Sequence, residues 1–541
     1  MSRPKYVSGR PLLGIALVAV MLVTACAAPA VTPSAPQGGT ESRSIDSLTI
    51  QIGALGTEAL DPNLGQLDDK PYTRLLYSYL FDTDLADAKM SDKAGVAESY
   101  TWSADQKALT VVLRKGVKFH DGTELKAEDV KFSIGRNTNA ASLSVNAKSV
   151  ASLISSIEVI DAYKLVINLP NPSVTLIPLL SPYIGGTEGL IYPKAYFERV
   201  GEATFRQKPV GSGPYKLESR QVGSNMVFTV FNDYFLGKPN VGQMRFEVVP
   251  EKSTRVANLQ ADQADIVEIL RTDAADLKGK GFTTFSDEGG DAIIIVPLAW
   301  TDLAPNNPLT NAKVREALMT SINREEINRF LLQGIGHLSG SFIGEEAAIG
   351  GAPIAPYKYD PARARTLIAE AGLKPDELTV NLQVALKASY PEAKDIAVAI
   401  AADWKEIGVK TNVVAEDFGT LLPRLTARTV EQPSLFFNSI GLRPIWGPVM
   451  SLYFNCPVAK YGNCDPEVWT MIQSLNQVKD LEEYGKIQQQ IAQKMHDRHM
   501  TDVIAYIGRV FATSKKVTDW SLGLTPFDLN FRYLALKGLL P

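Results

Sequence analysis

Histidine and cysteine are the residues of this chain whose types and spacing could support catalysis or metal binding. His120 precedes an Asp-Gly turn, and His496 and His499 are spaced i, i+3, so they can share one face of a helix. No second His or Cys lies near His120 to complete a metal site or a nucleophilic set. We therefore favour a structural role for His120. The His pair is better interpreted as the solvated basic end of a helix, which also contains Lys494 and Arg498.

Catalytic motifs are missing from the sequence. There is no Gly-x-Ser-x-Gly elbow, no His-Glu-x-x-His and no Gly-x-x-x-x-Gly-Lys-Ser/Thr loop. The glycine- and proline-rich segment Pro209 to Leu217 could suggest a phosphate cradle, but it lacks the Lys-Ser/Thr and the helix that such a loop needs. A turn before a strand is the better interpretation. We expect no enzyme activity, no cofactor and no metal site.

An export signal opens the chain. Three basic residues precede the apolar run 12–23, which is shorter than the roughly 20 residues of a membrane span. Small residues at 23–25 lead into Cys26, as in a bacterial lipobox, so we expect Cys26 to be lipidated and to become the mature N-terminus. The alternative is a plain secretory peptide that is cleaved a few residues later, with Cys26 discarded.

Length and charge limit what the exported chain can be. Removal of the first 25 residues leaves 516, and loss of three basic residues changes the formal net charge from −4 to −7. A mildly acidic protein is a poor partner for nucleic acid or anionic lipid. A chain of this length exceeds what one core supports, so we expect two lobes behind a flexible linker rich in Pro, Gly and Ser.

Two cysteines, Cys456 and Cys464, remain besides Cys26. In an oxidising extracytoplasmic compartment they can close a small loop as a disulfide. The alternative is a pair of free, partly buried thiols. A zinc site is disfavoured because no His lies close to them in sequence.

Strand and helix patterns alternate along the chain. Short apolar runs at 48–52, 109–113 and 409–414 are typical of strands. A helix is predicted from Asp360-Pro361, an N-cap with a first-turn proline, to the stop at Gly372. This alternation predicts α/β layers.

Four sequence blocks in order identify a family. They are Leu113 to Thr123 (LRKGVKFHDGT) with its continuation to Ser133, then 209–217, 232–266 and 314–327. Together they closely resemble the large family 5 extracellular solute-binding proteins, the peptide- and nickel-type receptors of ABC importers. The resemblance covers nearly all of residues 46–541.

The resemblance implies a bilobal, periplasmic-binding-protein-like α/β fold of type II, with an extra subdomain in lobe one and hinged lobes around a ligand cleft. The expected boundaries are 1–25 for the signal peptide, 26–45 for the lipidated N-terminus and linker, 46–269 for lobe I with two subdomains, 270–502 for lobe II and 503–541 for the return to lobe I.

The resemblance also implies a function. The expected protein is a monomeric receptor, lipid-anchored in the periplasm or on the outer face of the cytoplasmic membrane. It would capture a small solute (a peptide, opine, sugar or related polar compound) and deliver it to an ABC permease with its ATPase. The alternatives are a secreted hydrolase with an unrecognised active site, or a sensor or chaperone on the same fold.

Aromatic and polar residues at strand ends are the ligand-binding candidates: Trp300, Phe437, Asn438, Arg443 and Trp446. Peptide-binding members resemble Gly-Trp-x-x-Asp-Tyr-Pro-Asp near the loop that holds Arg443, and use an Asp to hold the ligand's amino group. That Asp is absent here, so an anionic or neutral polar ligand is at least as well supported. The alternative is that Arg443 is solvated, and that Trp446 and Trp300 are packing residues.

Overall fold

Two separate sheet systems form the frame of the protein. The computed structural model describes residues 45–536, except 67–68, 85–89, 92, 145, 184–185, 287–289, 301–303, 346–348, 375, 388–389, 391, 457–461, 518, 521 and 523–528. The predicted signal peptide, Cys26 and nearly all of the predicted linker lie outside the described residues.

Lobe I is built on a seven-stranded sheet, in which β1 pairs in parallel with both β12 and β13. Its order is β10 (Tyr215–Gln221), β11 (Asn225–Val230), β12 (Val241–Val248), β1 (Ile45–Ile52), β13 (Ile266–Ile269), β20 (Val510–Thr513) and β14 (Thr283–Ser286).

A four-stranded antiparallel sheet and two short ladders complete the strands of lobe I. The four-stranded sheet, which forms the predicted extra subdomain, has the order β5 (Ala97–Trp102), β6 (Ala108–Leu113), β8 (Lys164–Asn168) and β7 (Ser156–Asp161). The ladders pair β2 (Ser78–Tyr79) with β9 (Leu190–Ile191), and β3 (Asp82–Thr83) with β4 (Met90–Ser91).

Lobe II is built on a five-stranded sheet, in which β15 runs opposite to the other four strands. Its order is β17 (Val409–Asp417), β16 (Leu378–Leu386), β18 (Ser434–Gly441), β15 (Asp291–Leu298) and β19 (Asp502–Ile507).

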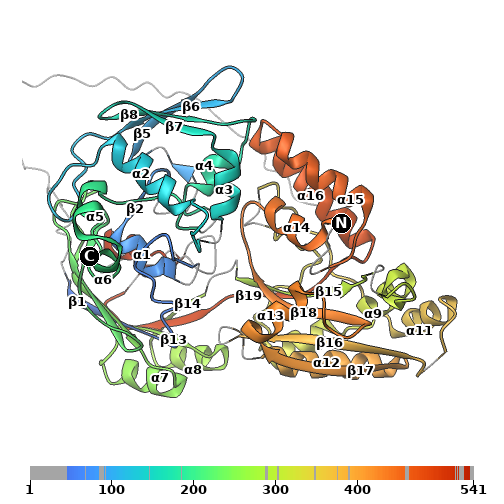
Figure 1. Ribbon diagram of the computed structural model, residues 1–541. Coiled ribbons are helices and arrows are strands. Elements are labelled where there is room, and N and C mark those ends of the chain that lie inside the picture. The colour runs from blue at the N-terminus through green and yellow to red at the C-terminus, as the bar shows by residue number, and fades with distance from the viewer. Residues whose placement is uncertain are drawn as a thin grey trace, which may run out of the picture. The chain divides into compact units, whose positions relative to one another are not determined.

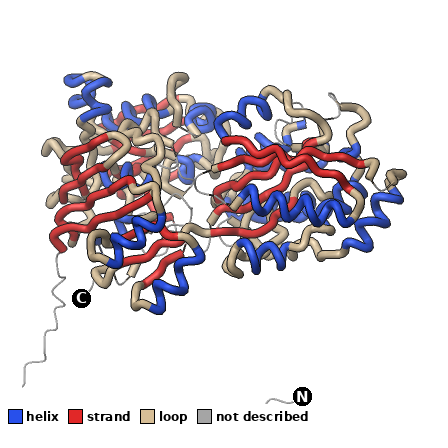
Figure 2. The backbone as a smooth tube through the Cα atoms, turned by 90° about the horizontal axis from the view of Figure 1, so that it is seen from below, coloured by secondary structure: helices blue, strands red, loops and turns tan. Residues whose placement is uncertain are grey.

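Helices surround both sheets, and Figure 2 shows helices lying over a face of the lobe II sheet. Lobe I carries α1 (Lys70–Leu76), α2 (Ala127–Asn137), α3 (Ala147–Leu153), α4 (Leu176–Leu179), α5 (Lys194–Val200), α6 (Glu202–Gln207), α7 (Lys252–Gln260), η2 (Arg271–Asp273), α8 (Ala274–Gly279) and α17 (Phe531–Leu536). Lobe II carries η3 (Pro308–Thr310), α9 (Ala312–Thr320), α10 (Arg324–Leu331), α11 (Pro361–Glu370), α12 (Ala393–Glu406), α13 (Phe418–Thr426), α14 (Gly447–Phe454), α15 (Pro466–Ser474), η5 (Leu475–Gln477) and α16 (Leu481–Asp497). Within the described residues, no helix combines the length and apolar character that a membrane crossing requires.

The predicted start of α11 is confirmed. The Asp360 side chain accepts a hydrogen bond from the backbone N–H of Arg363, at 2.8 Å, and Pro361 occupies the first turn. These groups satisfy and fix the first turn of the helix. Gly372, just past the end, adopts a φ of +80°, which suits glycine.

The chain crosses between the sheets twice. The first crossing lies between β14 and β15, because β14 pairs with β20 in the lobe I sheet. β14 is a short, half-polar strand, so its pattern resembles a loop. The second crossing is Gly508-Arg509, because one apolar stretch contains two strands, β19 in lobe II and β20 in lobe I. Figure 1 shows a red strand, from the C-terminal part of the chain, among the green strands of lobe I.

Candidate ligand-binding site

Both crossings leave the sheets at their carboxyl edges. In lobe II, the carboxyl ends of β16, β17, β18 and β19 and the start of β15 lie on one edge, which we call the junction edge. In lobe I, β1, β12, β13 and β14 end on the side where β20 begins. Ligands of open α/β sheets bind outside the carboxyl ends of strands, where the chain order switches. The junction edge is therefore the expected place for a ligand.

Four charged residues follow one another across the junction edge. Asp291 begins β15 and lies opposite Gly441 on β18 and Ile507 on β19. Arg443 and Arg509 each come two residues after these partners, so they leave the sheet on either side of Asp291. Lys387 follows the next strand, β16, and its Nζ donates a hydrogen bond to the Ser439 carbonyl at 2.7 Å.

Among the described residues at this edge, positive charge is in excess. Burial raises the pKa of Asp291, and the charges of Lys387, Arg509 and Arg443 oppose that rise. Burial lowers the pKa of Arg443, but a guanidinium starts high enough to remain charged at neutral pH. Three cations thus act on one carboxylate, and all four side chains belong to half-buried residues.

An ion pair joins the lobes beside the junction edge. Arg271, in η2 of lobe I, pairs with Glu392 at the start of α12 in lobe II, with Nη1 and Oε1 3.0 Å apart. The same guanidinium donates to the carbonyl of Gly508, in the second crossing, at 2.7 Å. Arg271 therefore fastens both lobes and the crossing with one side chain.

Three of the residues predicted from sequence lie near the junction edge. The guanidinium carbon of Arg443 is 5.5 Å from the ring centroid of Trp446, and its Nε donates to the Gly441 carbonyl at 3.2 Å. Trp446 is 0% exposed and packs on Phe342, so it supports Arg443 and has no open ring face. The side-chain oxygen of Asn438 is buried without a hydrogen-bond partner among the described residues.

The other two residues predicted from sequence, Phe437 and Trp300, are buried in the cores of lobe II. Phe437 is 0% exposed and packs on the helix-covered face of the sheet, with Tyr390 at 6.3 Å between ring centroids. Side chains alternate along a strand, so Asn438 faces the opposite way. Trp300 is buried just beyond β15, at the end of that strand away from Asp291, with the Arg428 guanidinium 5.1 Å from its ring.

A cavity of about 350 Å³ lies between the lobes, away from the crossings. Trp102 and Pro178 of lobe I and Leu481 at the start of α16 in lobe II are among its lining residues. Figure 1 shows α16 next to the part of lobe I that contains α4. The lobes therefore approach one another at this rim as well as at the crossings.

The histidines singled out from sequence serve the fold. His120 Nε2 hydrogen-bonds the Gly213 carbonyl at 3.0 Å, and its Nδ1 accepts from the Gly211 N–H at 3.3 Å, so it joins two of the four sequence blocks. His496 and His499 both stack on Tyr357. Within the part of the chain that the structure describes, no three His, Cys, Asp or Glu side chains are grouped to hold a metal ion.

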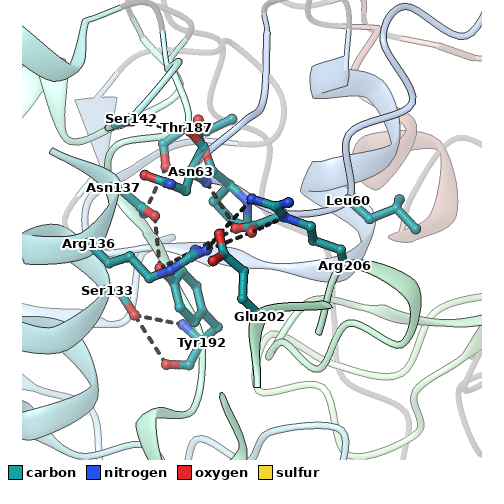
Figure 3. A network of polar contacts seen from close by, with 12 residues as sticks. Leu60, Asn63, Ser133, Arg136, Asn137, Ser142, Thr187, Tyr192, Glu202 and Arg206 are labelled. Carbon is teal, nitrogen blue, oxygen red and sulfur yellow. Dashed lines mark hydrogen bonds and ion pairs between the residues drawn. The ribbon is translucent and has the colours of Figure 1, made fainter. Parts of the chain in front are cut away.

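A buried polar network anchors the loop that follows β1 (Figure 3). Asp61, in this loop, accepts two hydrogen bonds from Arg136 of α2, at 2.6 and 2.7 Å. Arg136 also pairs with Glu202 of α6 at 3.0 Å. The network holds a segment at the carboxyl edge of lobe I, which faces the junction edge of lobe II.

Comparison with known proteins identifies the chain. A model of the bacterial extracellular solute-binding proteins, family 5 Middle, matches residues 93–454. The chain belongs to this family. It is 26% identical over 435 residues to the dipeptide-binding protein of Escherichia coli K12, covering 76% of this chain and 80% of that protein. It is 27% identical over 489 residues to the oligopeptide-binding protein AppA of Bacillus subtilis, covering 82% and 83%.

A solved structure shows the same fold. NikA from Brucella suis, in complex with Fe(III)-EDTA, matches with a TM-score of 0.76 at 19% identity, covering 90% of this chain and 98% of that one. The predicted α/β, periplasmic-binding-protein-like fold is confirmed. Members of this family are solute-binding proteins.

Sequence reasoning missed three of the four charges at the junction edge of this family 5 protein. Asp291, Lys387 and Arg509 lie in segments separated by roughly a hundred residues, and only the strand pairing brings them together. The available signal was a charged residue placed directly at the end of a buried apolar run, as for Arg509 after the run 503–507.

Cys456 and Cys464, the pair singled out from sequence, are joined by a disulfide in the structure. It follows α14, the helix that begins next to Trp446. The disulfide therefore fastens the segment after that helix and lies outside the charged junction edge.

Proposed function

We propose that this family 5 protein is the receptor of an ABC importer, holding a small polar solute at the junction edge and delivering it to a permease with its ATPase. The observation that supports this most strongly is the half-buried charged cluster at the carboxyl edge, beside the two crossings. Two crossing segments allow one lobe to rotate against the other, so a solute can be enclosed and released.

The solute class is wider than peptides in this proposal. The relatives are named for a dipeptide and an oligopeptide, and the NikA structure is a complex with Fe(III)-EDTA; these solutes are polar but differ in size and shape. We infer a peptide, opine, sugar or related polar compound, bound without covalent change. Asn438 supplies a buried acceptor, and Arg443 a cation.

Thermal unfolding of the exported chain with a panel of peptides, opines, sugars and metal chelates tests this proposal. A true ligand at a hundredfold excess over its Kd stabilises the folded state by about 2.7 kcal/mol, so the midpoint rises with ligand concentration. Asn438→Ala should weaken that response, whereas Asn412→Ala, at an exposed position on β17, should not. If no class raises the midpoint, the receptor proposal fails.

We also propose that Cys26 carries the lipid anchor, with the mature monomer outside the cytoplasmic membrane. The basic and apolar segments before Cys26 support this. Expression of Cys26→Ala in a bacterial host should release the protein from the membrane fraction and remove the diacylglyceryl mass from its N-terminal peptide. An unchanged membrane fraction would contradict the anchor.

A further inference from the structure

Two arginines at the junction edge have no ion-paired carboxylate among the residues that the structure describes. Within the described residues, neither Arg443 nor Arg509 has a carboxylate at ion-pair distance. Arg271, in contrast, is paired with Glu392 at 3.0 Å. A half-buried guanidinium without a carboxylate at ion-pair distance is costly, because burial removes the water that would otherwise stabilise it.

The hydrogen-bonding groups of these arginines are also largely unused. Arg443 makes one hydrogen bond with the described residues, from Nε to the Gly441 carbonyl, and four of the five N–H donors of a guanidinium remain. Arg509 makes none with the described residues, and its Nη2 is buried without a partner. Its guanidinium carbon lies 5.9 Å from the ring centroid of Phe511.

The surroundings hold these groups in place. The ring of Trp446, packed on Phe342, lies 5.5 Å from the guanidinium carbon of Arg443, and the bond to Gly441 fixes Nε. A guanidinium oriented in this way presents a planar pair of donors that matches the two oxygens of a carboxylate or phosphate.

We propose that the junction edge selects a solute carrying an oxyanion group, a carboxylate or a phosphate, which Arg443 and Arg509 bind together. This inference rests on the proposed receptor function and names the chemistry of its ligand. Among the described residues, Asp291, on the strand between them, is the one carboxylate whose charge acts with those of both arginines and Lys387, so positive charge remains for the ligand. A solute that presents only an ammonium at this edge would meet repulsion.

Paired probes that differ in one anionic group test the proposal by isothermal titration calorimetry at constant ionic strength. Trialanine against trialanine amide tests the carboxylate, and glucose 6-phosphate against glucose tests the phosphate. The anionic member of at least one pair should bind at least about tenfold more tightly, as expected for charge-assisted hydrogen bonds. The pair that shows the preference identifies the source of the oxyanion.

Variants of the two arginines test whether these residues cause the preference for the anionic probe. Arg443→Gln and Arg509→Gln should each reduce it to less than about threefold, whereas Arg443→Lys should keep part of it because the charge remains. Arg329→Gln is the matched control, since Arg329 is an exposed arginine of α10 in the same lobe. If one Gln variant does not fold, the binding preference is measured with the other Gln variant.

The outcomes separate the two proposals. If a neutral or cationic probe binds as tightly as its anionic partner, or the preference survives both Gln variants, the oxyanion inference is overturned while the receptor function stands. If none of the probes binds and the solute panel also gives no response, the receptor function is overturned, and the inference with it.

Discussion

The buried Asp61–Arg136 pair should be a main support of lobe I, and Asp61→Asn removes its negative charge with little change in shape. Asp61 is 1% exposed and Arg136 10%, and two hydrogen bonds of 2.6 and 2.7 Å join them. The substitution leaves Arg136 with Glu202, whose side chain is 48% exposed, and with the Tyr192 hydroxyl at 3.3 Å.

The magnitude follows from this geometry. Removing one partner of a buried ion pair costs about 3–5 kcal/mol, and Glu202 remains to offset part of it, so we expect Asp61→Asn to lose about 3 kcal/mol of unfolding free energy. The matched control is Glu202→Gln, at the exposed end of the same network, which should lose at most about 1 kcal/mol.

Urea unfolding at neutral pH, followed by circular dichroism, measures both variants. The double variant Asp61→Asn/Arg136→Gln should lose less than the sum of the single losses, with a coupling of about 2 kcal/mol, because neither charge is left unpaired. A loss for Asp61→Asn no larger than that for Glu202→Gln, or additive losses in the double variant, would refute the assignment of this pair as a buried support.

Three further predictions concern pH, lobe contact and the disulfide. Burial lowers the pKa of His120 to about 4, below the ordinary 6.5. The contribution of neutral His120 to the unfolding free energy is therefore present above pH 6.5 and is lost as pH falls toward 4, by at most about 3 kcal/mol. His120→Gln should reduce the loss of unfolding free energy between pH 7 and 4.5. Arg271→Gln should break the pair with Glu392, favour separated lobes, and weaken solute binding by about tenfold in calorimetry, as expected for a charged hydrogen bond. Reduction of Cys456–Cys464, which spans eight residues, should lower stability by about 2.5 kcal/mol in urea unfolding.

Each of these predictions has a control and a contrary result. The matched control is His337→Gln, at a histidine whose side chain is 60% exposed; an equal effect of both His variants would contradict the role of His120. Arg329→Gln should bind solute as the parent does. Unchanged binding by Arg271→Gln would contradict the role of the Arg271–Glu392 ion pair in holding the lobes together. A double Cys→Ser variant should be insensitive to reductant, and equal stability with and without reductant in the parent would exclude a stabilising disulfide.

Local sequence signals predicted individual elements well. Val409 begins the predicted strand as β17, and Asn323, as expected from its spacing to Glu326, accepts a hydrogen bond from the Glu326 N–H at the start of α10. Such features depend on neighbouring residues, so a sequence contains the information needed to place them.

The junction edge could not be predicted in the same way. Asp291, Arg443 and Arg509 become neighbours only through the pairing of β18, β15 and β19, and strand pairing between distant segments leaves little trace in one sequence. The face on which Phe437 lies could not be predicted for a related reason: a one-residue step along a strand exchanges the core face for the other face, and every residue of 434–441 is buried.

Solute binding at the junction edge between the two lobes can be tested by a crystal structure of the protein with a solute from the responding class. Electron density for the solute is expected beside Asp291, with its polar groups within hydrogen-bond distance of Arg443 or Arg509. Density confined to another place, such as the rim cavity next to Trp102 and Leu481, would contradict binding at the junction edge.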